Sequence, residues 1–368
     1  MKVTLNREDL SSALGKCIRV VPSKAVIPIT DFFLLSVTET LLSVRSTAID
    51  MHMSAEVKCQ AKESFAFCVP ARILHETIRM LRDDQIQITF KGKKAEFKTH
   101  SGKYSIGCLP PEEFTHLPPL SAVNNLVVAA PLLSKSFRIS GMFVNPKDNS
   151  KPALTGLNLF VKDRLLHVCG SSGFSISCCA FPFITGSSWD SIIVPLQIAR
   201  IAQEVFQSGD VTLSCDGQII MIKGDGVAVI STLINAKYPD IETHVFSKRT
   251  GTKRKFLRAQ MEEALRRVKT FMVETSTGVM VDLADTVVIK TEGSDHAAEE
   301  SFSSEGDGPV LTACLPQADL HRAASASDEE MGMEIFYSSE EPHKNRFILE
   351  VPDSSVREKY CIMALAAI

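Results

Sequence analysis

VPARILHETIRML, residues 69–81, decides the fold because the same kind of stretch occurs twice more along this 368-residue chain. VPLQIARIAQEVF begins at Val194, and LPQADLHRAASA begins at Leu315. In each stretch a proline follows an apolar residue and precedes a helix-like pattern, and the prolines at 70, 195 and 316 lie 125 and 121 residues apart. Proline suits the first turn of a helix, where the amide it lacks would have no partner. The spacing predicts three equivalent helices in a triplicated chain.

Strand-like runs surround each of these helices at similar offsets. Paired apolar runs around short polar turns begin at Phe32, Leu154 and Gly278, and further pairs begin at Gln85, Asp210 and Met333. A first helix with apolar residues at i and i+4 opens each unit, at 6–21, 130–144 and 258–272. We therefore predict an α+β chain of three repeated modules, each with two helices packed on antiparallel sheets of about eight strands. The expected domains are 1–122, 123–250 and 251–368, with junctions near the proline-rich residues 109–125 and the basic residues 247–256.

Composition excludes several classes of protein. Hydrophobic residues make up 45% of the chain and charged residues 23%, as in ordinary globular proteins, and the net charge of -3 gives no bulk attraction to nucleic acid or anionic lipid. The amino terminus MKVTLNRED places charges where a signal peptide needs apolar residues, and no apolar run is long enough for a membrane helix. We expect a cytoplasmic protein that does not bind membranes.

Ten cysteines are scattered along the chain without a CxxC pair, and Cys178 and Cys179 are adjacent. This is a poor framework for disulfides or zinc, so the sequence predicts reduced, mostly buried thiols and no metal site. No phosphate-binding loop, dinucleotide fingerprint or HExxH pair occurs either. We expect no cofactor and no nucleotide hydrolysis.

The stretch HVCGSSGFSISCC, residues 167–179, has the residue types of a catalytic site. A serine hydrolase using Ser172 or Ser175 is the enzyme alternative, but the spacing of a nucleophile elbow is missing. A turn at a strand end fits these serines and glycines better, and strand alternation suggests that His167 lies at the surface. A repeat scaffold that binds proteins without DNA is a third alternative.

Basic residues are spread over the predicted helices, which suggests phosphate contacts without base reading. They include Arg72, Arg79, Lys135, Arg138 and Arg200, and a denser group at Lys253, Arg254, Lys255, Arg258, Arg266, Arg267 and Lys269. The chain has one Trp and four Tyr, so it lacks the stacking platform of a single-strand binder. Contact with the backbone of duplex DNA is the favoured interpretation.

Several segments in this order resemble the bacterial sliding clamps, the beta subunits of the replicative DNA polymerase III. They are MKVTLNREDL, the block from IPITDFFLLSV to MHM, VPARIL, YSIGCLPPEEF, AKYPDIE and the terminal KYCIMALAAI. The resemblance covers the whole chain and implies a non-catalytic processivity factor. It implies a head-to-tail homodimer whose ring encircles duplex DNA, with helices inside and sheets outside. Implied partners are the polymerase alpha subunit, the clamp loader, other polymerases and mismatch-repair proteins, bound through short hydrophobic motifs at the nucleoid during replication.

The resemblance also assigns residues. Lys24 and Lys151 are implied DNA contacts, while Tyr104 and Ile106 of one copy are expected to meet Thr270 and Phe271 of the next. A hydrophobic groove for client peptides is implied at Leu154, Ser171, Gly173, Phe174, Ser175, Ile176, Pro239, His244, Cys361 and Met363. Phe174-Ser175-Ile176 stands where many members have His-Arg-Leu, and the chain ends in MALAAI, so a less basic groove is expected.

Overall fold

The structure is a computed structural model of the whole chain, and it describes residues 1–115, 124–148, 150–186, 188–246, 252–273, 276–293, 295–306, 310–326, 331–337, 346–352 and 354–365. Both predicted domain boundaries, after residues 122 and 250, lie outside these ranges, so the domain limits remain a prediction. The last three residues of MALAAI also lie outside them. None of the helices in these ranges has the length and apolar character needed to span a bilayer.

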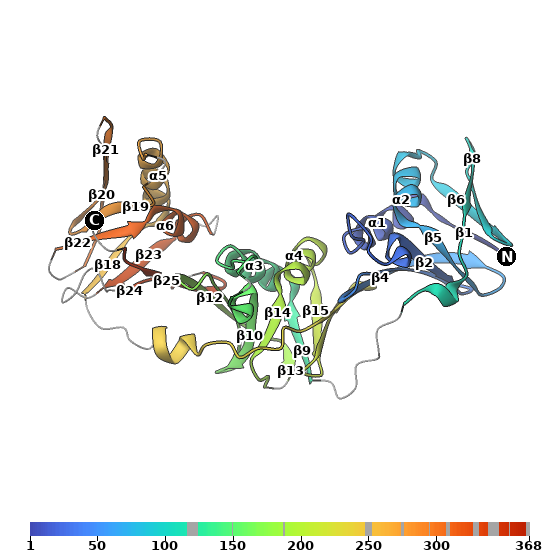
Figure 1. Ribbon diagram of the computed structural model, residues 1–368. Helices are drawn as coiled ribbons and strands as arrows, with labels where there is room; N and C mark the ends of the chain where they lie inside the picture. The colour runs from blue at the N-terminus through green and yellow to red at the C-terminus, as the bar shows by residue number, and fades with distance from the viewer. Residues whose placement is uncertain are drawn as a thin grey trace. The chain divides into compact units, whose positions relative to one another are not determined.

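The predicted threefold repeat is confirmed by the order of elements (Figure 1). The six α-helices found in the described ranges are α1 (Arg7–Cys17), α2 (Ala71–Met80), α3 (Ala130–Gly141), α4 (Leu196–Val205), α5 (Arg258–Lys269) and α6 (Gln317–Ala324). The first-module strands are β1 (Lys2–Asn6), β2 (Phe32–Val37), β3 (Leu41–Thr47), β4 (Met51–Ala61), β5 (Phe65–Pro70), β6 (Gln85–Lys91), β7 (Lys94–Lys98) and β8 (Lys103–Gly107). Two helices and about eight strands per module agree with the sequence pattern.

The second and third modules repeat this order. The second contains β9 (Asn124–Ala129), β10 (Gly156–Lys162), β11 (Leu165–Ser171), β12 (Ser175–Pro182), β13 (Thr185–Gly186), β14 (Ile192–Pro195), β15 (Asp210–Cys215), β16 (Ile219–Gly224) and β17 (Val227–Thr232). The third contains β18 (Thr252–Leu257), β19 (Gly278–Leu283), β20 (Thr286–Glu292), β21 (Ala297–Ser303), β22 (Leu311–Pro316), β23 (Gly332–Tyr337), β24 (Arg346–Val351) and β25 (Arg357–Met363). Each predicted hairpin is an antiparallel pair, as in β2–β3, β10–β11 and β19–β20.

Local sequence explains where these elements begin and turn. Asn6 caps α1 by accepting hydrogen bonds from the amides of Glu8 and Asp9. Pro70 and Pro316 occupy the N-cap positions of α2 and α6, one residue before the helical position predicted for them. The β10–β11 hairpin turns at Asp163 and Arg164, which both have positive φ as a two-residue primed turn requires.

The chain forms two compact units, one of residues 1–130 and 204–233, the other of residues 131–203 and 234–368. In the first unit a sheet runs in the order β9-β15-β16-β17-β4-β1-β6-β7-β8. In the second unit one sheet runs β14-β10-β11-β12-β25-β24-β23-β18 and another runs β21-β20-β19-β22. The pairings β17–β4 and β12–β25 thus join strands of neighbouring modules into continuous sheets.

The helices are held by the apolar stripes seen in the sequence. Their side chains at i and i+4, namely Leu10, Leu14, Leu133, Phe137, Met261 and Leu265, are all buried. The helix pairs α1–α2 and α5–α6 each pack together. Burial of such side chains contributes roughly 1.5–3 kcal/mol each, which makes these stripes the main cause of helix placement.

One prediction about the cysteines is wrong. Cys169 and Cys178 form a disulfide, whereas Cys17, Cys59, Cys68, Cys108, Cys179, Cys215, Cys314 and Cys361 are free. All eight free thiols are buried except that of Cys314, which is half-buried. The disulfide arises because β11 and β12 pair in a register that sets Cys169 directly opposite Cys178 on one face of the sheet.

Candidate functional site

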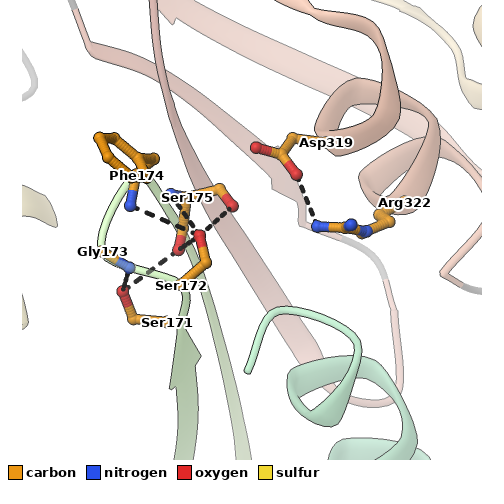
Figure 2. A network of polar contacts seen from close by, with 7 residues as sticks. All are labelled: Ser171, Ser172, Gly173, Phe174, Ser175, Asp319 and Arg322. Atoms are coloured by element: carbon orange, nitrogen blue, oxygen red, sulfur yellow. Dashed lines mark hydrogen bonds and ion pairs between the residues drawn. The ribbon is translucent and has the colours of Figure 1, made fainter. Parts of the chain in front are cut away.

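The turn between β11 and β12 is built by its serines (Figure 2). The Ser172 amide donates to the Ser175 carbonyl at 3.0 Å, and the Ser171 hydroxyl donates to the same carbonyl at 3.2 Å. Ser171 Oγ also accepts from the Gly173 amide at 3.0 Å, while the hydroxyls of Ser172 and Ser175 lie 3.0 Å apart. Gly173 has a φ of 91°, which favours glycine. These serine hydroxyls therefore form the hydrogen bonds that hold a tight turn together.

The geometry gives no support to a serine hydrolase at this turn. Ser175 is fully buried, its hydroxyl bonds to that of Ser172, and the Ser172 hydroxyl accepts hydrogen bonds from the amides of Phe174 and Ser175. Within the part of the chain that the structure describes, neither hydroxyl bonds to a histidine or carboxylate that could act as general base. Asp319 in Figure 2 forms an ion pair with Arg322 at 2.6 Å.

The surface position expected for His167 is wrong. The residue is only 7% exposed, and its ring stacks on that of Phe160 with centroids 4.7 Å apart. Residues two apart on a strand share a face, so His167 lies on the same buried face as Cys169.

The apolar residues predicted for the groove belong to one cluster, here called the Leu154 cluster. Its buried members are Leu154, Cys169, Cys178, Ile193, Tyr238, Ile241, Phe246, Ile348 and Cys361, and half-buried Ile176 and Val245 pack against them. The strand pair β12–β25 places Ile176 opposite Cys361, and the Met363 amide donates to the Phe174 carbonyl at 3.3 Å. Nine of the ten predicted groove residues lie in this cluster, among the residues packed on it, in the turn beside it, or next in sequence to one of these, and the tenth, Met363, follows Cys361 by two residues on β25.

Two large apolar side chains remain accessible beside the cluster. Phe174 is 70% exposed and Met363 is 41% exposed. Pro239 and His244 are exposed as well, and the His244 carbonyl accepts a hydrogen bond of 2.7 Å from Arg346 Nη1 on β24. We call Leu154, Gly173, Phe174, Ile176 and Met363 the turn-edge surface. Sequence reasoning did not identify Tyr238 and Ile241 as buried members of the Leu154 cluster beside this surface. Their apolar character in the segment YPDIETHVF was a usable signal.

The predicted DNA contacts differ in their surroundings. Lys24, Lys151 and Arg200 are exposed, and Arg138 is half-buried. Arg72 Nη2 donates to the Pro22 carbonyl at 2.7 Å, and Arg79 pairs with Glu76 at 3.2 Å.

Lys135 differs from the other predicted DNA contacts, because its Nζ lies 3.4 Å from Glu358 Oε1 and 3.0 Å from Ser354 Oγ. The Lys135 side chain is 15% exposed and that of Glu358 is 0% exposed. An ammonium that neutralises a buried carboxylate is a poor phosphate ligand, because removing it would leave that carboxylate unpaired.

The dense basic group of the third module is also largely structural. Arg254 is buried and bonds to Asp285 at 2.6 Å, while buried Arg258 donates to the Ala324 carbonyl at 2.9 Å. Arg267 pairs with Glu300 at 2.8 Å and with Glu263 at 3.2 Å. Linear charge counting therefore overstated the accessible positive charge of this module.

Two of the four predicted interface residues lie on an edge strand, and the other two follow a helix. Tyr104 and Ile106 are on β8, the last strand of its sheet, and Ile106 is buried. Thr270 and Phe271 directly follow α5, and both are exposed. The third-module strand β21 is an edge strand of the sheet β21-β20-β19-β22.

Comparison with known proteins agrees with the repeat. Residues 1–118 match the model of the DNA polymerase III beta subunit N-terminal domain, and residues 140–240 match that of the central domain, together more than half of the chain. Beta sliding clamps of Streptomyces coelicolor and Synechococcus elongatus are 22% and 23% identical, over 93% and 71% of this chain and 93% and 73% of theirs.

Solved structures agree as well. The DNA polymerase III subunit beta of Pseudomonas aeruginosa superposes with a TM-score of 0.90 at 21% identity, and the DNA polymerase sliding clamp of Bacillus subtilis with 0.90 at 15%. Each pair of chains is covered completely. At this identity the likeness establishes the fold, while the two domain matches establish the family. This chain belongs to the DNA polymerase III beta subunits, the bacterial sliding clamps.

Proposed function

We propose that two copies of this chain close head to tail into a ring around duplex DNA and tether a replicative polymerase as its processivity factor. The observation that carries this proposal is the family match over two successive modules of a threefold repeat. The proposed module limits are 1–122, 123–250 and 251–368. Such a protein works at the nucleoid in the cytoplasm and needs topological linkage to DNA rather than tight binding.

Two sheet edges support ring closure. The strand β8 has β7 as its only hydrogen-bonded neighbour among the described strands, and β21 similarly has only β20. Near β8 the exposed charges include Lys94 and Lys98, whereas β21 carries exposed Glu299. Opposite charges favour pairing of two such edges from different copies. Exposed Tyr104 and Phe271 add apolar area, and Thr270 adds less than an aliphatic side chain would.

Exposed cations support weak DNA contact. Lys24, Lys151 and Arg200 have no ion pair among the described residues, and the same holds for half-buried Arg138. Single phosphate contacts of this kind are independent of sequence and weaken with salt. A ring held by linkage could therefore slide, because no base contact fixes its position.

The turn-edge surface supports docking of short client segments. Exposed Phe174 and Met363 lie beside the buried Leu154 cluster, so an apolar anchor of a flexible peptide could extend that cluster. Each anchor contributes a few kcal/mol of burial less its ordering cost, which gives modest affinity and allows exchange. The proposed clients are the polymerase alpha subunit, the clamp loader, other polymerases and mismatch-repair proteins.

Retention on circular DNA tests the ring. The full chain, loaded onto a nicked plasmid by the clamp loader of the same cell, is expected to stay bound at high salt and to leave when the plasmid is linearised. Salt weakens phosphate contacts, but it does not open a topological link. Retention that does not depend on linearisation would show ordinary DNA binding instead, and failure to load under any condition would favour the scaffold alternative.

A peptide titration tests the client surface separately. Met363→Asp and Ile176→Asp place a charge where an apolar anchor is expected, so binding of a fluorescent peptide with Leu and Phe anchors should be lost while the dimer persists. Ile184→Asp is the matched control, because Ile184 is an exposed aliphatic residue just beyond the opposite end of β12. Equal affinity in all three variants would contradict the assignment of this surface.

A further inference from the structure

A histidine, a cysteine and a carboxylate meet at the centre of the β11–β12 hairpin. Their candidate ligand atoms, from His167, Cys178 and Glu242, all lie within 4.8 Å of one another, and His167 Nδ1 is 4.0 Å from Cys178 Sγ. His167 and Cys178 come from adjacent strands, while Glu242 comes from the segment after β17. This grouping could not be predicted from the sequence, because it depends on strand register and on the path of the segment that contains Glu242.

Two polar atoms of this group are buried without a partner. His167 Nε2 and Glu242 Oε2 are inaccessible to solvent, and neither forms a hydrogen bond to any described residue. His167 is 7% exposed. Buried polar atoms are nearly always satisfied, so two unsatisfied ones close together suggest a binding site for an ion.

The surroundings favour a cation. His167 and Glu242 line a cavity of about 390 Å³. Its charged lining residues are Asp163, Glu242, Glu350 and Glu358 against Arg357 and Lys359, and with Glu358 paired to Lys135 the remaining excess is one negative charge. Lys359 Nζ lies 3.6 Å from Glu242 Oε1, whereas Oε2 of the same carboxylate has no hydrogen-bond partner among the described residues.

We propose that His167, Cys178 and Glu242 bind a divalent transition metal ion of the Zn²⁺ class when the disulfide between Cys169 and Cys178 is reduced. Nitrogen, sulfur and oxygen ligands of this kind surround tetrahedral zinc at about 2.0–2.3 Å, which separates ligand atoms by about 3.3–3.8 Å. The 4.0 Å contact and the 4.8 Å limit are close to this spacing. Cys169, directly opposite Cys178, is the natural fourth ligand.

Metal binding requires reduction of the disulfide because a sulfur in a disulfide cannot bind metal as a thiolate. A phosphine reductant breaks the S–S bond, takes the oxygen of one water as phosphine oxide and leaves that water's two hydrogens on the two sulfurs. Metal binding then releases the thiol protons. In the cell a dithiol performs the same two-electron reduction by exchange and is itself oxidised to a disulfide.

Cobalt spectroscopy of the full chain tests this site. After phosphine reduction and removal of metals, titration with Co²⁺ should give a thiolate-to-cobalt charge-transfer band and tetrahedral visible bands that saturate at one ion per chain. Zn²⁺ should displace the cobalt. Without reduction, the thiolate band should be absent.

Single substitutions identify the ligands. Cys178→Ser should abolish the charge-transfer band, and His167→Gln and Glu242→Gln should each weaken cobalt binding about tenfold or more. Cys179→Ser is the matched control, because Cys179 is the next residue of β12 but lies on the opposite face. Since Glu242 is only half-buried, Glu242→Gln should fold even if a core variant does not. A reduced chain without the band, a band unchanged in Cys178→Ser, or equal metal binding by the oxidised chain would overturn the proposal.

Discussion

The turn of the β11–β12 hairpin and the centre of the hairpin differ in whether their polar side chains have hydrogen-bond partners. At the turn, the hydroxyls of Ser171, Ser172 and Ser175 bond to the turn and to one another, and Phe174 is left exposed. A few residues away, at the centre of the hairpin, His167 Nε2 is buried without a partner among the described residues, and Nδ1 of the same ring lies 4.0 Å from the Cys178 sulfur. The turn therefore offers an apolar surface, whereas the centre offers coordinating atoms.

The largest expected effect on stability comes from substituting a glycine on the opposite face of the same hairpin. A Cβ at Gly170 would lie 2.1 Å from the Ser140 carbonyl oxygen of α3, and the Ser140 hydroxyl donates to the Val168 carbonyl at 2.8 Å. Gly170→Ala should thus push α3 from β11 and lower the free energy of unfolding by about 3 kcal/mol in urea denaturation. Gly107→Ala is the control, because a Cβ there meets nothing within 4 Å. Equal stability of the two variants would contradict this close helix–strand contact.

The repeat could be predicted from the sequence because the apolar spacing of a helix or strand involves only residues that are close together in the chain. The helices and hairpins follow from apolar spacing and turn residues, and those signals recur with each module. The resemblance to the clamps then indicated the residues around the turn, and the structure brings them together at the Leu154 cluster. Their role in client binding remains a prediction.

What the sequence could not give depends on register and on long-range pairing. The disulfide requires Cys169 to face Cys178 across two strands, and the neutralisation of Lys135 requires Glu358 from the last strand, over 200 residues later. His167 was placed at the surface because alternation predicts which residues share a face, but not which face is covered. Charge counting failed for Arg254 on β18 and for Arg258 on α5 for the same reason.

A second glycine tests the turn, with an intermediate effect. Gly173 has a φ of 91°, and a Cβ there would have room, with Lys151 Nζ 3.4 Å away as its nearest neighbour. Gly173→Ala should therefore cost about 1–2 kcal/mol from backbone conformation alone. Urea denaturation should show this loss, and Gly173→Asn should lose less because asparagine tolerates positive φ. A loss as large as that of Gly170→Ala would show that the turn is packed more tightly than these distances indicate.

Phe174→Ala should have the smallest effect on folding and a clear effect on binding. With 70% of Phe174 exposed, the free energy of unfolding should change by no more than about 0.5 kcal/mol. If the turn-edge surface binds client peptides, loss of this ring should lower the affinity for a fluorescent peptide about tenfold, which corresponds to about 1.4 kcal/mol of binding free energy. Phe174→His restores the residue common among the clamps, so a change of peptide preference in that variant would identify position 174 as a specificity determinant. Unchanged affinity for every peptide in both variants would show that Phe174 is only an exposed turn residue, and that the difference between the turn and the centre of the hairpin does not extend to client binding.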